Sequence, residues 1–113
     1  MAKKVQRSDV LVIGGGLVGA VAARALSHAG LSVTVIDGED PKTATKAGFD
    51  GRASAIAAAS ERLLSALDIW PHLVDQVSPI LDIRVADGAS PMYLHYDHED
   101  VGLGPLGYLA ENR

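Results

Sequence analysis

The sequence contains no cysteine and very few aromatic residues. The absence of cysteine excludes a disulfide framework, cysteine-ligated metal sites and thiol catalysis, and it fits a reducing compartment such as the cytoplasm. Aromatic residues make up 4% of the chain, so its apolar content comes mainly from Ala, Val, Leu and Ile. That mix suits helices packed on a sheet, and the charged fraction of 21% is typical of a globular domain rather than a disordered one.

A long apolar run and an excess of positive charge are also missing. The longest apolar run covers residues 10–23 and contains four glycines. It is shorter than the ~20 residues that a membrane-spanning helix needs. The formal net charge is −4, and a nucleic-acid partner is therefore not expected, because phosphate contacts require clustered Lys and Arg.

The first forty residues have the pattern of a βαβ unit. Residues 9–13 are a short apolar run before three glycines, which predicts a strand buried on both faces. Residues 32–36 predict a second, parallel strand that ends at Asp37. Between them a helix is predicted from Leu17 to a stop at Gly30. Its expected inner face consists of Val18, Val21, Ala22, Ala25, Leu26 and Ala29.

Residues 14–19 satisfy the G-x-G-x-x-G pattern between the first strand and the helix. Gly14 would allow the tight turn, Gly16 the approach of a cofactor pyrophosphate, and Gly19 close packing of helix on strand. The amides of Leu17 and Val18 would point at the phosphates from the helix N-terminus. The motif therefore predicts a site for the ADP half of a dinucleotide.

Asp37 at the end of the second strand completes the fingerprint. Its carboxylate can accept hydrogen bonds from the adenosine ribose hydroxyls, and it would repel a 2′-phosphate, which argues against NADP. The pattern does not separate FAD from NAD. The alternative is a glycine-rich turn in an unrelated α/β domain, with Asp37 as a surface residue.

The remainder predicts an exposed loop over residues 38–51, a helix over 53–67 and a helical turn over 72–77. The expected apolar stripe of the helix consists of Ile56, Ala59, Leu63 and Leu67. Antiparallel strands are predicted over residues 80–85 and 92–96, with a turn at Asp87-Gly88, and a third strand over 107–110.

Ligand-type side chains lie close together over residues 95–100. In a strand His95 and His98 would face opposite sides, so we expect a solvated hairpin rim and no metal site. The sequence shows no nucleophile constellation, and we assign no catalytic residue.

Two segments of the chain resemble segments of flavin monooxygenases that hydroxylate ubiquinone precursors. They are residues 49–56, Phe-Asp-Gly-Arg-Ala-Ser-Ala-Ile, and residues 106–112, Leu-Gly-Tyr-Leu-Ala-Glu-Asn. The chain resembles the N-terminal part of the UbiH/UbiF-type hydroxylases, within the larger para-hydroxybenzoate hydroxylase class. By this resemblance Arg52 would lie near the FAD pyrophosphate, with Asp50 and Ser54 shaping the loop. Otherwise, Asp50 could cap the following helix and Arg52 could be a solvated arginine. Gly38 departs from the family, in which a basic residue often stands beside the adenosine.

The resemblance implies an α/β fold, with a Rossmann-like FAD-binding βαβ unit, then helices and the start of an antiparallel substrate-domain sheet. Residues 1–78 would be the FAD-binding segment, and residues 79–113 would form the first substrate-domain strands and return to the FAD domain. The chain would be a fragment of a larger fold.

The implied function is FAD-dependent hydroxylation of an aromatic, prenylated ubiquinone precursor through a flavin C4a-hydroperoxide, with NAD(P)H as reductant. The fragment alone would be inactive. Peripheral membrane association and contact with other ubiquinone-biosynthesis proteins are expected. The alternatives are another FAD- or NAD-dependent oxidoreductase, or a non-catalytic nucleotide-binding module.

Overall fold

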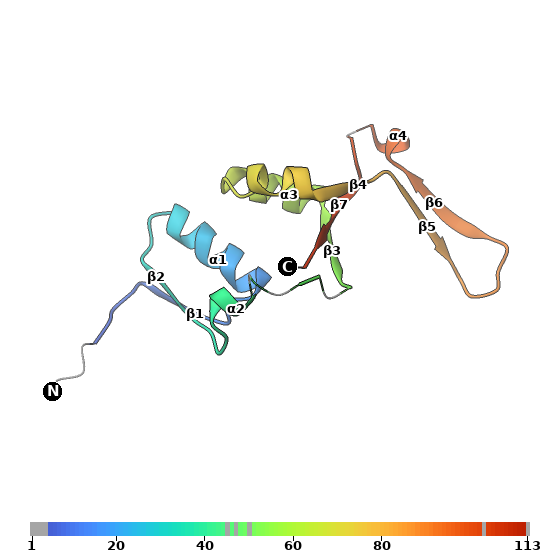
Figure 1. The fold of residues 1–113 in the computed structure, drawn as a ribbon. Helices are drawn as coiled ribbons and strands as arrows, with labels where there is room; N and C mark the ends of the chain where they lie inside the picture. Colours follow the sequence, from blue (N-terminus) through green and yellow to red (C-terminus); the bar gives the residue numbers. More distant parts are fainter. Residues whose placement is uncertain (1–4, 45, 47, 50, 103, 113) are drawn as a thin grey trace. The chain divides into compact units, whose positions relative to one another are not determined.

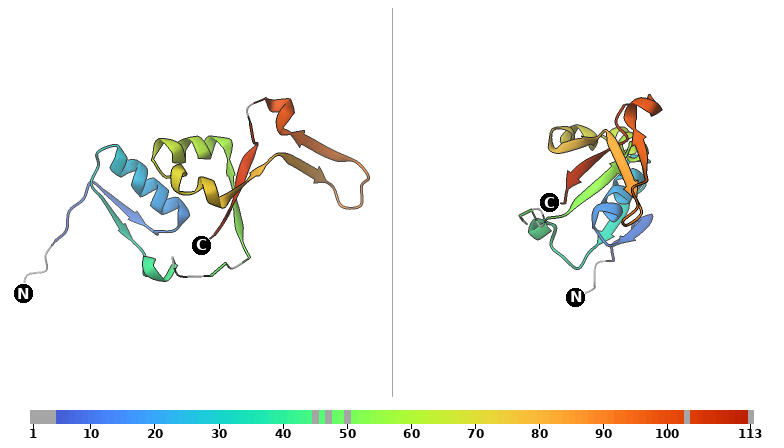
Figure 2. Two further views of the ribbon diagram at one scale, coloured as in Figure 1. Left: turned by 45° about the horizontal axis from the view of Figure 1, so that its top comes forward. Right: turned by 90° about the vertical axis from the view of Figure 1, so that its right-hand side faces the viewer.

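The structure, a computed structural model, describes residues 5–112 except residues 45, 47, 50 and 103. The chain divides into two compact units, Met1–Gly48 and Phe49–Arg113. Figures 1 and 2 show the elements of each unit as ribbons.

The first unit is the predicted βαβ arrangement. Strand β1 (Val10–Ile13), helix α1 (Leu17–His28) and strand β2 (Val33–Ile36) follow one another, and the two strands are parallel. Their register pairs Val10 with Val33 and Ile13 with Ile36. The chain enters α1 through the glycine turn and leaves it at Gly30, where φ is +90°, so the predicted stop is confirmed.

Two expectations about burial in this unit are wrong. Strand β1 is not buried on both faces, because Val10 and Val12 are half-buried while the side chain of Ile13 is 82% exposed. Helix α1 covers one face of the two strands, and the described residues leave the other face exposed. On the helix itself, Val18, Ala22 and Ala29 of the predicted inner face are exposed. The half-buried positions of α1 are Gly19, Val21, Ala23, Ala25 and Leu26.

The segment predicted as a plain loop contains a short helix, α2 (Pro41–Ala44). Asp40 precedes it, and its side chain accepts a hydrogen bond of 2.9 Å from the amide of Lys42. Proline at the first helical position and a side-chain acceptor just before it are both favourable at a helix start.

The second unit contains a three-stranded antiparallel sheet in the order β3-β7-β4. Its strands are β3 (Ala53–Ala57), β7 (Gly107–Glu111) and β4 (Val77–Ile80). The predicted helix over residues 53–67 therefore begins too early, since α3 covers only Ala58–Ala66. The side chains buried beneath the helix are Leu64 and Leu67, whereas Leu63 is exposed and Ile56 lies in β3. Only Leu67 of the predicted stripe is thus part of this small core.

Short elements and a long hairpin complete this unit. The 3-10 turns η1 (Trp70–His72) and η2 (Val74–Gln76) replace the single predicted turn. The Trp70 ring meets the ring of Tyr108 edge-on, with centroids 4.8 Å apart. The hairpin pairs β5 (Asp82–Ala86) with β6 (Tyr93–Asp97), and helix α4 (His98–Val101) follows it.

These elements confirm the predicted fold class, a mixed α/β chain in which a βαβ unit is followed by helices and antiparallel strands. Within the part of the chain that the structure describes, no helix has both the length and the apolar character needed to cross a membrane.

Candidate nucleotide-binding site

The glycine turn between β1 and α1 has the geometry that its motif predicts. Gly14 has a φ of +99°, a conformation that favours glycine, and its amide donates a 2.7 Å hydrogen bond to the carbonyl of Ile36. A β-carbon at Gly19 would lie 1.9 Å from the carbonyl oxygen of Gly14. Gly19 therefore permits the helix to start directly against the turn, while its β-carbon would be in ordinary contact, at 3.5 Å, with Val12 of β1.

Gly16 differs from Gly19, because a β-carbon built on it would meet nothing within 4 Å. It is the N-cap of α1, and its carbonyl accepts the first helical hydrogen bond, from the amide of Ala20 at 2.9 Å. The side chains of Leu17 and Val18 are exposed at this helix end. The first amides of a helix have no partner within it, and the helix dipole makes this end favourable for an anion.

Asp37 is held by two backbone amides. One carboxylate oxygen accepts from Gly15 in the glycine turn, and the other accepts a 2.8 Å hydrogen bond from Glu39. The hydrogen bonds from the amides of Glu39 and Gly15 hold the pKa of Asp37 below its ordinary value. The side chain is therefore a fixed carboxylate at neutral pH, with lone pairs left to accept from hydroxyl groups.

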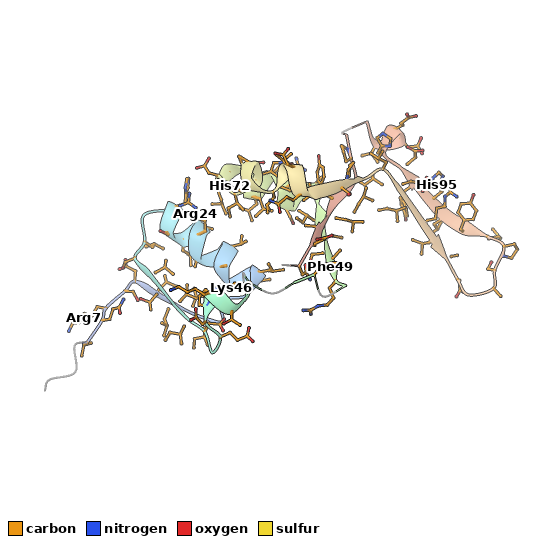
Figure 3. All side chains as sticks on the ribbon, viewed as in Figure 1. Arg7, Arg24, Lys46, Phe49, His72 and His95 are labelled. Carbon is orange, nitrogen blue, oxygen red and sulfur yellow. The ribbon has the colours of Figure 1, made fainter. Side chains whose placement is uncertain are left out.

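A hollow of about 700 Å³ opens beside these groups. This volume is within the range of small-molecule sites, roughly 300–1,000 Å³. All of its lining residues belong to the first unit: Gly15, Gly16, Ala20, Ala23, Val35, Asp37, Glu39, Asp40 and Pro41. The small side chains of α1 form its apolar wall, and the acidic residues after β2 form its polar rim. Arg24 projects from the side of α1 turned away from the strands (Figure 3).

The structure thus brings together six of the seven sequence-predicted site residues, since Gly14, Gly16, Leu17, Val18, Gly19 and Asp37 all lie around the turn. Arg52 belongs to the second unit and directly precedes β3, where its carbonyl accepts from the amide of Asn112 at 3.1 Å. Ser54 donates a 2.6 Å hydrogen bond to the Asn112 side chain. Asp50 lies outside the described residues.

Sequence reasoning missed the two amides that orient Asp37 and the other residues that line the hollow, which are Ala20, Ala23, Val35, Asp40 and Pro41. Gly15 supplies the amide that orients Asp37, and Glu39 supplies the second amide. The Glu39 contact has a local signal, because an aspartate side chain often accepts from the amide two residues later. The Gly15 contact joins residues that are distant in the sequence, and only the fold brings them together.

A model of FAD dependent oxidoreductases matches residues 9–102, which is most of the chain. The chain belongs to this family. The chain is 55% identical to ubiquinone hydroxylase UbiL of Rhodospirillum rubrum over 106 residues, which are 94% of this chain and 24% of that protein. It is 31% identical to 3-demethoxyubiquinol 3-hydroxylase of Escherichia coli over 109 residues, 95% of this chain and 28% of that protein.

A human relative, the mitochondrial ubiquinone biosynthesis monooxygenase COQ6, is 30% identical over 111 residues, 92% of this chain and 23% of that protein. The chain therefore spans about a quarter of the length of these relatives. The expected resemblance to ubiquinone-biosynthesis hydroxylases is confirmed by these proteins.

Proposed function

We propose that the first unit holds the ADP half of FAD. The observation that carries this proposal is the hollow lined by the glycine turn and by an Asp37 carboxylate fixed on both oxygens. The pyrophosphate would lie against Gly16 and the amides of Leu17 and Val18. The ribose hydroxyls would donate to Asp37, and the adenine would lie over the small side chains of Ala20 and Ala23.

Gly16 and the acidic rim of the hollow support the same placement of the ligand. A β-carbon at Gly16 would meet no protein atom within 4 Å, although Gly16 lines the hollow, so packing alone does not require glycine there. A glycine here would instead leave room for the phosphates of a ligand to approach the backbone. The acidic rim of Asp37, Glu39 and Asp40 would repel an additional phosphate on the ribose, which favours FAD over NADP.

We further propose that the complete protein is a monooxygenase that hydroxylates an aromatic, prenylated precursor of ubiquinone. The support is the 55% identity to a ubiquinone hydroxylase over nearly the whole chain. When bound, FAD supplies the redox chemistry with molecular oxygen. The residues of this chain bind and orient its adenosine and pyrophosphate end. Arg52 would place a guanidinium beside the phosphate oxygens, where it can neutralise their charge.

The remaining roles follow from the same proposal. Residues 1–78 would serve as the FAD-binding segment, and residues 79–113 would supply the first substrate-domain strands and the return to the FAD domain. NAD(P)H would be the reductant. The apolar tail of a prenylated substrate would favour peripheral membrane association and contact with other proteins of ubiquinone synthesis.

The hydroxylase proposal can be tested in a bacterium that lacks its own ubiquinone hydroxylase. The complete open reading frame that encodes this chain should restore ubiquinone, and Arg52→Ala should reduce the restored amount at least tenfold. Arg62→Ala is the matched control, because Arg62 is an exposed arginine on α3. The quinones are quantified by liquid chromatography with mass spectrometry.

Failure of the wild-type frame to restore ubiquinone, although the protein is present at normal levels, would refute the hydroxylase assignment. If the purified protein is yellow in that case, it is a different FAD-dependent oxidoreductase. A colourless protein that binds NADH would instead be an NAD-dependent enzyme, and one that binds AMP alone would be a nucleotide-binding module.

A further inference from the structure

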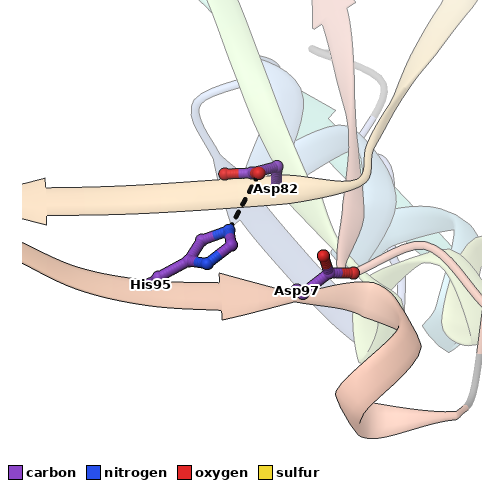
Figure 4. Close-up of side chains that lie close together, drawn as sticks. All are labelled: Asp82, His95 and Asp97. Carbon is purple, nitrogen blue, oxygen red and sulfur yellow. Dashed lines mark hydrogen bonds and ion pairs between the residues drawn. The ribbon is translucent and has the colours of Figure 1, made fainter.

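Three side chains with metal-ligating atoms converge at the base of the β5–β6 hairpin, away from the glycine turn. Asp82 is the first residue of β5, and His95 and Asp97 lie two residues apart near the end of β6. The register pairs Asp82 with Asp97 and Arg84 with His95, so the three side chains share one face of the hairpin. Figure 4 shows them gathered there.

The distances between their atoms are short. Nε2 of His95 lies 2.9 Å from Oδ2 of Asp82, and one ligand atom from each of the three residues lies within 4.8 Å of the others. Ligand atoms around a tetrahedral Zn²⁺ ion are about 3.4 Å apart, given metal–ligand distances of about 2.1 Å. All three side chains are partly exposed, so small rotations can bring the atoms to this spacing.

We propose that Asp82, His95 and Asp97 form a binding site for a divalent transition-metal ion of the Zn²⁺ type. One imidazole and two carboxylates are ligands that zinc accepts, and three protein ligands leave a further position for water. The two negative charges of the carboxylates balance the charge of the ion. Neutral His95 would bind through Nε2, with its proton on Nδ1.

Neighbouring groups orient the two carboxylates in the way that supports a metal site. Oδ1 of Asp97 accepts from the amide of Glu99 at 2.9 Å and lies 3.2 Å from Nδ1 of His98, which leaves Oδ2 for the ion. Arg84 contacts both oxygens of Asp82, with Nε 3.3 Å from Oδ1 and Nη2 donating at 3.4 Å to Oδ2. An ion at Oδ2, the oxygen beside His95, would therefore replace the Nη2 contact, while Nε continues to hold Oδ1. Partners of this kind fix the orientation of metal ligands in known sites.

The sequence predicted no metal site here, because only residues 95–100 bring ligand-type side chains close together along the chain. In a strand, His95 and His98 of that segment would face opposite sides. In the structure His98 begins α4, and the additional ligand comes from Asp82 on the neighbouring strand. A bound ion would therefore join β5 to β6 at the end of the hairpin farthest from its turn, and it would stabilise the hairpin because it binds only the paired strands.

Calorimetric titration of the 113-residue chain with Zn²⁺ at pH 7.5 tests the proposal. We expect one ion per chain, and His95→Asn and Asp82→Asn should each weaken binding at least tenfold. The control is His28→Asn, an exposed histidine of α1 that should bind Zn²⁺ like the wild type. Far-ultraviolet circular dichroism verifies that each variant keeps its fold.

The long-range ¹H–¹⁵N spectrum of the histidine side chains gives an independent readout. One equivalent of Zn²⁺ should shift the Nε2 resonance of His95 by many parts per million and leave those of His28 and His72 in place. The absence of saturable Zn²⁺ binding by the folded wild type would overturn the proposal. So would a His95→Asn variant that binds as tightly as the wild type.

Discussion

At Gly19, a β-carbon would lie 1.9 Å from the carbonyl oxygen of Gly14, an atom of the backbone that a side-chain rotation cannot move. We predict that Gly19→Ala lowers the free energy of unfolding of the first unit by ~1–3 kcal/mol, the usual cost of overpacking. Gly16→Ala should change the free energy of unfolding by less than ~0.5 kcal/mol, because its β-carbon meets no neighbour. Urea denaturation followed by circular dichroism measures both, and equal stability of the two variants would contradict the geometry.

Asp9 and Ser32 link the starts of β1 and β2. The Ser32 hydroxyl donates to Oδ2 of Asp9 at 2.6 Å, and the Ser32 amide donates to the same oxygen at 2.8 Å. These hydrogen bonds, the hydroxyl first, hold the pKa of Asp9 below its ordinary value of 3.8. Because the folded-state pKa is depressed, the stabilisation is complete above that ordinary value and is lost as the pH falls through the folded-state pKa.

We therefore predict that Ser32→Ala raises the pKa of Asp9 towards 3.8 and reduces the loss of stability between pH 5 and the acid range. Carboxyl ¹³C resonances of Asp9, followed by NMR across this pH range, measure the shift. Ser27→Ala on α1 is the control and should leave Asp9 unchanged. An Asp9 pKa that is the same in wild type and Ser32→Ala would disprove the assigned cause.

Asp37 should determine the choice between ribose and phosphorylated ribose. We predict that Asp37→Asn weakens ADP binding by about tenfold, since hydrogen bonds to a charged group contribute about 1.5–3 kcal/mol. The same variant should bind 2′-phospho-ADP better than the wild type does, because the repelling charge is gone. Isothermal titration with both ligands checks this, and an unchanged preference would exclude Asp37 as the discriminating group.

Among the helices and strands, the sequence predicts those whose pattern of apolar and polar residues is complete within a short stretch of the chain. Strands β1 and β2 are short apolar runs with glycine or aspartate at their ends, and α1 is an unbroken periodic stretch, so all three appear where expected. The hairpin of β5 and β6 has alternating side chains on either side of Asp87-Gly88, and it is also confirmed. These signals reside within a dozen residues and do not depend on the rest of the fold.

Strand β3 could not be predicted in this way. Its residues, Ala53–Ala57, are rich in alanine, which has the highest helix propensity, and the predicted helix therefore extended over them. The strand forms because its backbone pairs with β7, in a register that joins Ala53 to Glu111. Strand β4 includes Pro79 and pairs with the other edge of β7. Such distant partners override local propensity.

The central strand β7 permits a direct test of this sheet. A β-carbon at Gly107 would lie 2.6 Å from the carbonyl oxygen of Ile56 on β3, the residue before Ala57, which pairs with Gly107. We predict that Gly107→Ala costs about 1–3 kcal/mol of unfolding free energy and lowers amide protection in β3 and β7. Hydrogen exchange measured by NMR locates the effect. Gly38→Ala, which meets no neighbour, is the control, and amide protection in β3 that survives Gly107→Ala would count against the packing described.

In the molecule as a whole, the sequence predicts those residues of the candidate site that lie next to one another along the chain. Five of the predicted residues lie within the glycine motif, and Asp37 follows from the strand that the motif requires. The orienting amide of Gly15 and the acidic rim of the hollow depend on how the chain folds back after β2. The Asp82–His95–Asp97 cluster depends in the same way on strand pairing, which a reading along the chain does not provide.

Binding of the ADP half of FAD by the first unit can be tested by competition on immobilised AMP. The wild-type chain should bind the AMP resin and be eluted by FAD and by ADP at similar concentrations, but only weakly by NADP. Gly16→Val, whose β-carbon would meet no protein atom within 4 Å, should not bind the resin. Wild-type chain that passes through the AMP resin, or Gly16→Val that binds as well as the wild type, would contradict the proposal.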